Sequence, residues 1–330
     1  MQVADAIVVG GGPAGSTSAW KLRQAGLDVV VLDRAKFPRT KLCAGWVTPQ
    51  VMTDLELDPR DYPLSFMTFE ELHLHWKGFT KKLQSPQHSI RRLEFDDFLL
   101  RRSKAQVLQH EVRDIQRVNG DYVLDDEFRC KYLVGAGGTA CPVYRKLFRR
   151  RNPRCSWLQT ATYEQEFRYD WHDAACHLWF FDDGLPGYAW YVPKANGHIN
   201  VGLGGMAVQL KHGKARLHDH WQRFVGKLEK RGLVSYEHYH PTGYSYFLHG
   251  NVDVVSEGNA YIVGDAVGLA TRDMCEGIGP AVKSGLLAAE AIVTSNNYSL
   301  AGIDALSGSG LSSKILEHKF VGVNRRVANE

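Results

Sequence analysis

Long apolar runs are missing from this sequence. No stretch reaches the roughly 18–20 apolar residues that a helix needs to cross a bilayer. The first strand pattern begins almost directly after Met1, so no signal peptide is expected. We therefore expect a cytoplasmic protein, with peripheral contact to a membrane as a further option.

The sequence also has few cysteines and little net charge. None of the six cysteines forms a Cys-x-x-Cys pair, so neither a zinc site nor a disulfide framework is indicated. A net charge of +4 is too small to imply a nucleic-acid partner. Three His-x-His pairs lack a cysteine or carboxylate at ligand spacing, so we expect no metal site. These pairs are His73/His75, His218/His220 and His238/His240.

Positive charge is nevertheless concentrated in one segment, residues 145–154, called the basic segment below. Its six basic residues are Arg145, Lys146, Arg149, Arg150, Arg151 and Arg154. A solvated helix end and loop is the favoured interpretation. The alternatives are a docking surface for an acidic electron-donor protein, for a cofactor phosphate, or for an anionic membrane.

What the sequence does contain, near its beginning, is a glycine-rich turn. An apolar run from Ala6 leads into this turn, and a helical pattern follows at 16–25. Strand, tight turn and helix in this order are typical of dinucleotide binding, because the glycines let a pyrophosphate approach the backbone amides of the helix start. We expect five turn residues to contact the cofactor: Gly10, Gly12, Pro13, Ala14 and Gly15.

Two carboxylates indicate which dinucleotide is bound. The strand at 28–33 ends in Asp33, which can accept hydrogen bonds from the adenosine ribose, and Arg34 follows it. A late strand runs into Gly264 and Asp265, and a flavin's ribityl hydroxyls provide a partner for that second carboxylate. A simple nicotinamide dehydrogenase has no need of it, so FAD is the predicted cofactor.

The segment after this late strand is expected to reach the flavin ring. Residues 276–279 would direct backbone amides and a helix start at the isoalloxazine, stabilising the negative charge of the reduced ring. Gly277 and Ile278 are therefore candidate cofactor-binding residues.

The order of patterns along the chain predicts an α/β fold, α+β overall. We expect a doubly wound, FAD-binding Rossmann-like lobe and an antiparallel β-sheet substrate lobe rich in aromatic residues. The first lobe comprises residues 1–60, 90–150 and 255–300, the second 61–89 and 151–254, and 301–330 form a C-terminal tail. Further expected elements are helices at 90–102 and 213–231 and a single strand at 107–117.

An aromatic motif lies in the predicted substrate lobe. Tyr188-Ala-Trp190-Tyr-Val-Pro193 is followed by Gly202-Leu-Gly204. It is similar to the Y-x-W-x-F-P-x(7–8)-G-x-G motif of the geranylgeranyl reductases, within the para-hydroxybenzoate hydroxylase superfamily. The chain resembles that flavoprotein family over nearly its whole length. In the family this segment lines the substrate cavity, which implies that Tyr188 and Trp190 bind an apolar substrate.

Two shorter motifs carry the same resemblance. Lys41-Leu-Cys43-Ala-Gly45 is similar to the family's K-x-C-x-G, which implies flavin contacts from Ala44 and Gly45. Cys43 becomes a candidate catalytic residue, although shaping the pocket or simple packing are open roles for it.

Arg92 begins a segment that resembles the family's R-x-x-F-D, whose arginine contacts the cofactor. The alternative for Arg92 is an ion pair at the helix start with Glu94 or Asp96. The resemblance also implies that the backbone near Val112 holds the adenine.

The sequence departs from the family at two places. The usual G-A-D-G is Gly-Ala-Gly-Gly at 135–138, which removes a carboxylate that organises both cofactors' pyrophosphates. NAD(P)H therefore remains one option among electron donors. The loop after Asp265 carries Arg272 and Cys275 where the family commonly has proline and glycine, so the substrate chemistry can differ.

The function predicted is an FAD-dependent oxidoreductase that reduces a C=C bond of an apolar substrate, such as a prenyl chain, by hydride transfer from reduced flavin. The proton would come from Cys43 or from water. A flavin-dependent monooxygenase or halogenase acting on an aromatic substrate is the rival, although Tyr188 stands at the first Trp of the halogenase pattern W-x-W-x-I-P. A third possibility is a non-enzymatic prenyl-lipid carrier, against which the presence of Asp33 and Asp265 argues.

Overall fold

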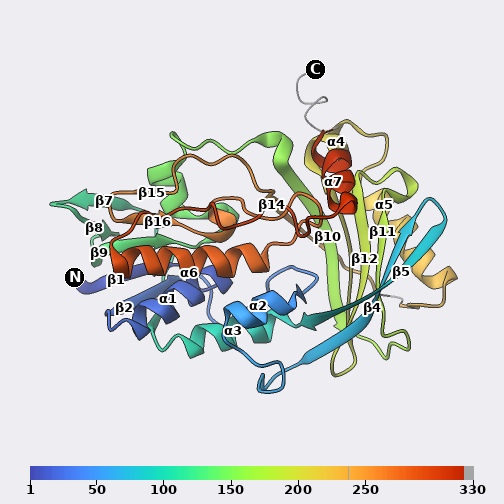
Figure 1. Ribbon diagram of the computed structural model, residues 1–330, viewed down its shortest axis with the longest axis horizontal. Helices are drawn as coiled ribbons and strands as arrows, with labels where there is room; N and C mark the ends of the chain where they lie inside the picture. The colour runs from blue at the N-terminus through green and yellow to red at the C-terminus, as the bar shows by residue number, and fades with distance from the viewer. Residues whose placement is uncertain (237, 323–330) are drawn as a thin grey trace. The chain divides into compact units, whose positions relative to one another are not determined.

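The computed structural model describes residues 1–236 and 238–322, and it contains two eight-stranded sheets (Figure 1). The chain divides into two compact units, each assembled from three segments. Unit 1 comprises Met1–Arg39, Phe95–Cys155 and Phe247–Gly308, and unit 2 comprises Thr40–Glu94, Ser156–Tyr246 and Ser309–Glu330. Residues 40–60, placed in the FAD-binding lobe from the sequence, fall in unit 2 by this division.

Unit 1 contains the predicted parallel sheet, in the order β15-β16-β9-β1-β2-β6. The second half of β1 and the whole of β2 are buried, nearly continuous apolar runs, because both faces of a parallel sheet are covered. An antiparallel ribbon, β7 and β8, pairs with β9. The strand bounds are β1 (Gln2–Val9), β2 (Val29–Asp33), β6 (Gln106–Gln109), β7 (Ile115–Val118), β8 (Asp121–Leu124), β9 (Phe128–Gly135), β15 (Ser256–Glu257) and β16 (Ala260–Ile262).

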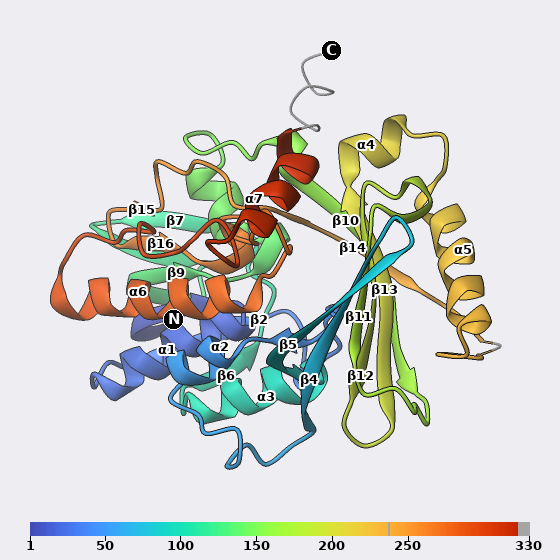
Figure 2. The same ribbon diagram turned by 45° about the vertical axis from the view of Figure 1, so that its right-hand side comes forward.

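Two helices of unit 1, α1 (Pro13–Gln24) and α6 (Ile278–Thr294), lie side by side in both views (Figures 1 and 2). Gly285 makes this close approach possible, since a Cβ at that position would stand 2.5 Å from the Ala14 carbonyl oxygen. The Ser18 hydroxyl donates a hydrogen bond to the Gly285 carbonyl at 3.1 Å. The N-terminal turn and the late segment of the chain are thereby held together.

The prediction of one strand over 107–117 was wrong. β6 pairs in parallel with β2, whereas β7 pairs with β8, and residues 110–114 between them form no strand. The Asp125 carboxylate explains the break, because it accepts hydrogen bonds from the Arg113 amide at 3.1 Å and the Asp114 amide at 2.6 Å. Backbone donors that bond to a side chain are not available for a strand ladder.

Unit 2 contains the second sheet, in the order β14-β10-β13-β12-β11-β4-β5-β3. It differs from a purely antiparallel sheet because β4 and β11 are parallel. These two strands are far apart in sequence, so no hairpin dictates their direction. The bounds are β3 (Trp46–Val47), β4 (Phe66–Trp76), β5 (Phe79–Ile90), β10 (Gln159–Arg168), β11 (Cys176–Phe180), β12 (Gly187–Lys194), β13 (His198–Met206) and β14 (Thr242–Phe247).

Helix α5 (Leu217–Lys230) runs alongside this sheet (Figure 2) and corresponds to the helix expected at 213–231. Its Phe224 ring packs against Trp179 of β11, with 5.5 Å between the ring centroids. The alternation of side chains along β11 and β12 therefore defines an α5 face of the sheet, with Trp179 and Tyr191, and an opposite face with Tyr188 and Trp190.

Part of the predicted C-terminal tail packs onto unit 2. Helix α7 (Leu311–Glu317) is followed by a single π-helical turn, η6 (His318–Gly322). Phe320 in this turn is buried, and its ring lies 5.0 Å from the Phe181 ring and 6.3 Å from the Tyr188 ring. Residues 323–330 of the predicted tail lie outside the described residues. The remaining helices are α2 (Pro49–Asp54), α3 (Arg92–Arg102) and α4 (Ala207–His212).

Among the described residues, no helix combines the length and apolar character that crossing a bilayer requires.

Candidate functional site

The glycine-rich turn of unit 1 has the geometry that its sequence predicts. Gly10 adopts a φ of +112°, which favours glycine. A side chain at Gly15 would overlap the Gly10 carbonyl, whereas a Cβ at Gly12 would meet only the tip of Arg39, at 3.4 Å. Gly10 and Gly15 are thus required by the turn itself, and Gly12 leaves an open approach to the backbone.

The start of α1 offers hydrogen-bond donors to an anion. Gly12 is the N-cap, Pro13 occupies the first turn, and no side chain caps the helix. The first amides of a helix have no intrahelical acceptor and lie at the positive end of its dipole. A pyrophosphate therefore fits the turn in both shape and charge.

Asp33 connects the end of β2 to this turn. Its Oδ2 accepts a hydrogen bond from the Gly11 amide at 2.7 Å, and its Oδ1 accepts one from the Ala35 amide at 2.8 Å. Each carboxylate oxygen has a second lone pair, so the ribose interaction predicted for Asp33 remains feasible. Arg34 is exposed, and Val112 is buried in the core of unit 1.

The late strand reaches the same turn. The Gly264 amide donates to Ser284 Oγ at 2.9 Å, and a Cβ on Gly264 would stand 3.0 Å from Ala14 Cβ. Asp265 follows, with its Oδ1 3.6 Å from the position that a Cβ on Gly277 would take. Two motifs at opposite ends of the sequence are therefore adjacent, as a single FAD site requires.

Glu276 occupies the amides at the start of α6. Its Oε1 accepts a hydrogen bond from the Gly279 amide at 2.6 Å, and the Ile278 amide is also directed at this carboxyl. Burial raises the pKa of Glu276 to about 7. Such amides were expected to face the flavin ring, and here a side chain caps them.

Arg154 is a residue whose role the sequence did not reveal. Its guanidinium donates to the carbonyls of Thr139, Asp265 and Ala266 at 2.5, 3.2 and 2.9 Å. It also stacks over the Tyr144 ring, 4.0 Å from the centroid. Arg154 thus fixes the turn that carries Asp265, and the other five basic residues of the basic segment are exposed.

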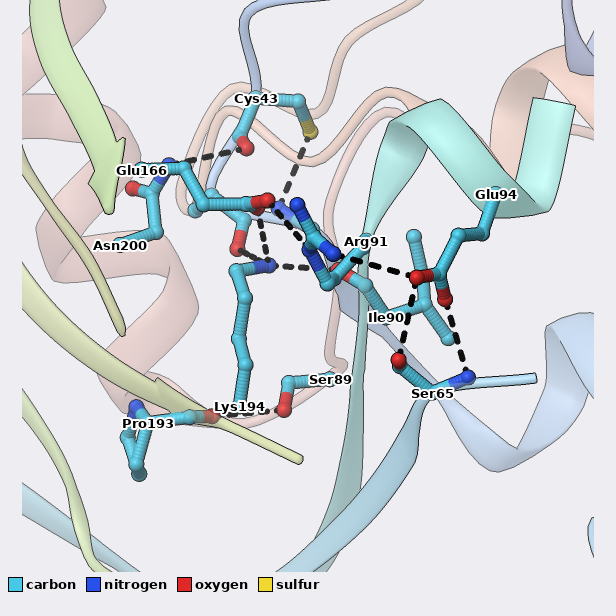
Figure 3. A network of polar contacts seen from close by, with 12 residues as sticks. Cys43, Ser65, Ser89, Ile90, Arg91, Glu94, Glu166, Pro193, Lys194 and Asn200 are labelled. Carbon is cyan, nitrogen blue, oxygen red and sulfur yellow. Dashed lines mark hydrogen bonds and ion pairs between the residues drawn. The ribbon is translucent and has the colours of Figure 1, made fainter. Parts of the chain in front are cut away.

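Unit 2 places the K-x-C-x-G segment around a buried lysine (Figure 3). Lys194 Nζ donates to the Ala44 carbonyl at 2.8 Å and to the Ile90 carbonyl at 2.5 Å, and it pairs with Glu166 Oε2 at 3.4 Å. Gly45 adopts a φ of +70°, and a side chain there would overlap Lys194 Nζ. The lysine therefore fixes the backbone of this segment.

Asn200 links Cys43 to the aromatic motif. Its Nδ2 donates to the Cys43 carbonyl at 3.3 Å (Figure 3). Its Oδ1 accepts a hydrogen bond from Trp190 Nε1 at 2.7 Å. The Cys43 thiol accepts a contact from the Gly45 amide at 3.4 Å. Tyr188 and Trp190 are neighbours on one face of β12, with 5.8 Å between their ring centroids.

The packing of Trp190 explains why a glycine stands at position 202, after the aromatic motif. It pairs with Trp190 across β12 and β13 and with Glu164 across β10 and β13. A Cβ at Gly202 would overlap the Trp190 indole. The glycine therefore provides the space that the tryptophan ring fills.

Glu164 is a second residue that the motif analysis missed. It is 3% exposed, and its Oε2 has no hydrogen-bond partner. Burial raises its pKa to about 7, against the opposing effects of Lys41, Lys194, an Asn200 hydrogen bond and Arg92. The alternation along β10 could have indicated it. Glu164 lies on the same buried face of the strand as Thr160 and Thr162, where an unpaired charge is unfavourable.

Arg92 is buried at the start of α3 and acts on Glu164 through its charge. Of the two acids near it at the helix start, Glu94 pairs with Arg91 at 3.2 Å and Asp96 pairs with Arg39 at 3.3 Å.

Each candidate residue belongs to one of the two units. Unit 1 holds Gly10, Gly12, Pro13, Ala14, Gly15, Asp33, Arg34, Val112, Gly264, Asp265, Gly277 and Ile278. Unit 2 holds Cys43, Ala44, Gly45, Arg92, Tyr188 and Trp190.

The chain is similar to known flavoproteins. Residues 5–87 match the family model described as FAD dependent oxidoreductase. The menaquinone reductase of Mycolicibacterium smegmatis is 31% identical over 87% of this chain and 76% of its own length. The geranylgeranyl diphosphate reductase of Synechocystis is 29% identical over 88% of this chain and 75% of its own length.

Among solved structures, a geranylgeranyl bacteriochlorophyll reductase-like protein from Thermoplasma acidophilum is similar, with a TM-score of 0.76 and 20% identity. The match covers 99% of this chain and 86% of that one. The fold and the dinucleotide site define an FAD-dependent oxidoreductase. The chain belongs to the geranylgeranyl reductase family of these flavoproteins, as the sequence resemblance predicted.

Proposed function

We propose that this oxidoreductase reduces a carbon–carbon double bond of an apolar, prenyl-type substrate. The names of its relatives support this substrate class. Such a reduction adds a hydride to one carbon and a proton to the other, and the bound flavin supplies the hydride. The observation that carries the proposal is a buried carboxyl, Glu164, which stands next to Gly202 on one side as the Trp190 indole does on the other, and whose raised pKa lets it hold a proton.

In this proposal one residue orients the substrate and another donates the proton. Trp190 offers an apolar surface to the substrate, and its hydrogen bond to Asn200 fixes the ring. Glu164 holds a proton near neutral pH because burial raises its pKa to about 7. A general acid is most effective when its pKa is close to the operating pH. Cys43 is the second candidate for this proton.

The electron donor is proposed to be NAD(P)H or an acidic electron-donor protein. The exposed residues of the basic segment support the second option, and they also provide a surface for peripheral contact with an anionic membrane. A cytoplasmic location is proposed with either contact.

Anaerobic stopped-flow absorbance tests the reaction class. We expect NADH, NADPH or dithionite to bleach the flavin, and a prenyl lipid to restore its absorbance without oxygen. Mass spectrometry should then detect a product two mass units heavier than the lipid. Substrate-coupled oxygen consumption, with no reoxidation by lipid under anaerobic conditions, would instead identify a monooxygenase or halogenase.

Replacement of Trp190 should weaken substrate binding without affecting FAD content. Trp190→Phe keeps an aromatic ring but loses the hydrogen bond to Asn200, and Trp190→Ala removes the apolar surface altogether. We expect KM to rise about tenfold or more in the alanine variant, since a buried aromatic contact contributes about 1.5–3 kcal/mol. Trp179→Phe, on the α5 face, is the matched control. Unchanged KM in both Trp190 variants would contradict the assignment.

A further inference from the structure

Three potential metal-binding side chains lie together on the α5 face of the unit 2 sheet. His73 and Asp173 accompany His177, and one ligand atom from each lies within 4.8 Å of the others. The parallel pairing of β4 with β11 creates the cluster, because His177 stands directly opposite His73. Both histidines are buried, at 8% and 5% exposed, whereas the Asp173 side chain is 30% exposed.

The spacing within the cluster suits a metal ion. His177 Nε2 lies 3.0 Å from Asp173 Oδ2. Two ligands of a tetrahedral zinc ion, each about 2.0–2.1 Å from it, are about 3.3 Å apart. An ion can therefore replace the proton shared by this pair with little movement of either side chain.

Charges around the cluster act in both directions. The positive charge of Arg231 acts on His177 and opposes a cation. The carboxylates of Asp173 and Glu71, each in contact with a histidine of the cluster, supply negative charge in compensation.

Each histidine has the outer hydrogen bond that orients a metal ligand. His73 Nε2 lies 2.8 Å from Glu71 Oε2, and His177 Nδ1 lies 3.0 Å from His75 Nε2. His75 Nδ1 in turn lies 2.8 Å from Thr80 Oγ1. Carboxylates and hydrogen-bond acceptors behind metal-bound imidazoles fix the ring tautomer and raise metal affinity.

We propose that His73, Asp173 and His177 form a binding site for a divalent transition-metal ion of the zinc class, with water as the fourth ligand. The site lies on the face of the sheet opposite Tyr188 and Trp190, so its role is structural: it joins β4, β11 and the loop that carries Asp173. Neutral imidazole with one carboxylate is a ligand set that suits zinc.

Metal binding reverses the hydrogen-bond direction along the chain from His177 to Thr80. Without metal, the Thr80 hydroxyl donates to His75, His75 donates to His177, and His177 Nε2–H donates to Asp173. With metal on His177 Nε2, the proton of each ring moves to Nδ1, and His75 Nδ1–H donates to Thr80. The two rings keep the same number of protons, so this step neither releases nor consumes one.

Metal content of tag-free, FAD-loaded protein tests the site. We expect about one equivalent of zinc by plasma mass spectrometry after dialysis against buffer with trace zinc, and a cobalt-substituted form with tetrahedral visible absorption bands. His177→Gln and His73→Gln should reduce metal content to background while FAD content is retained. His218→Gln, a histidine of α5 outside the cluster, is the matched control and should keep the metal.

Two further measurements test the site without replacing a histidine. Thr80→Val leaves all three ligands in place and removes the last acceptor of the chain, so we expect metal affinity to fall about 10- to 100-fold. Nitrogen-15 NMR of the wild type should detect His75 changing from the Nε2–H to the Nδ1–H tautomer on zinc addition. Wild-type protein that binds no zinc in titration, or binds it equally in His177→Gln, overturns the proposal.

Discussion

Glu164→Gln should lower the rate of substrate reduction about 10²- to 10⁴-fold, the usual contribution of a general acid, and leave FAD content unchanged. Glutamine keeps the volume of the side chain and its hydrogen bond with Asn200, but it carries no acidic proton. Single-turnover reoxidation of the reduced protein by a prenyl lipid is the measurement. Glu229→Gln, an exposed acid of α5, is the matched control.

The pKa of Glu164 also predicts how the rate of substrate reduction changes with pH. Burial raises the pKa of Glu164 to about 7, so the acid form is present below pH 7 and is lost above it. Wild-type rates should therefore be level at low pH and fall about tenfold per pH unit above pH 7. The Glu164→Gln variant should lack this decrease. An equal decrease in both proteins would contradict the role of Glu164, and a full loss in Cys43→Ser would transfer the role to Cys43.

Stability provides an independent measure of the same pKa. Ionising a buried carboxyl with a raised pKa destabilises the folded state, and the penalty is absent below the unfolded pKa of 4.5. A shift from 4.5 to about 7 corresponds to about 3 kcal/mol at high pH. Glu164→Gln should therefore have a higher Tm than the wild type at pH 9 and the same Tm at pH 4. Equal stability at pH 9 would show that the carboxyl ionises without penalty.

Asp265→Ala should weaken FAD binding about 10- to 100-fold while the protein remains folded. Charge-assisted hydrogen bonds to the ribityl chain account for this loss, at about 1.5–3 kcal/mol. Arg154 donates to the backbone carbonyl of Asp265, which the substitution retains, so the turn keeps this support in the variant. Flavin absorbance per protein after gel filtration, with circular dichroism as the folding control, is the measurement.

Two further variants sharpen the Asp265 experiment. Asp265→Asn retains the shape and loses the charge, so its FAD affinity should lie between those of the wild type and the alanine variant. Asp253→Ala removes an exposed acid from the same unit and should bind FAD normally. Full flavin retention in Asp265→Ala would show that the carboxylate does not hold the ribityl chain.

The parallel sheet and its glycine-rich turn were predictable because each depends on local sequence. An apolar run, a glycine that requires positive φ and a following helix identify the unit without knowledge of the rest of the chain. The contact of Ala14 with Gly264 followed only from assigning both motifs to one FAD, since nothing local joins residues 250 positions apart. The break in the strand expected at 107–117 was not predictable, because it depends on the Asp125 side chain.

The features missed in unit 2 share one physical origin. Glu164 acquires its raised pKa from burial by the surrounding sheet, and the histidine cluster arises only when β4 meets β11. His73 and His177 stand opposite each other on β4 and β11 but lie far apart in sequence, so ligand spacing within one motif could not identify them. Short patterns report neighbours along the chain, whereas these groups are neighbours across strands.

Gly202 limits which substitutions are possible at Trp190 in the aromatic motif. The Trp190 ring fills the volume beside this glycine, so a side chain at position 202 would overlap the indole. Substitution of Trp190 by a smaller residue would open space on one side of position 202 only, because a Cβ there would still stand 2.7 Å from Glu164 Cβ on the other side. Attempts to enlarge the space beside Trp190 should therefore keep the glycine at position 202, whose missing side chain both neighbouring strands require.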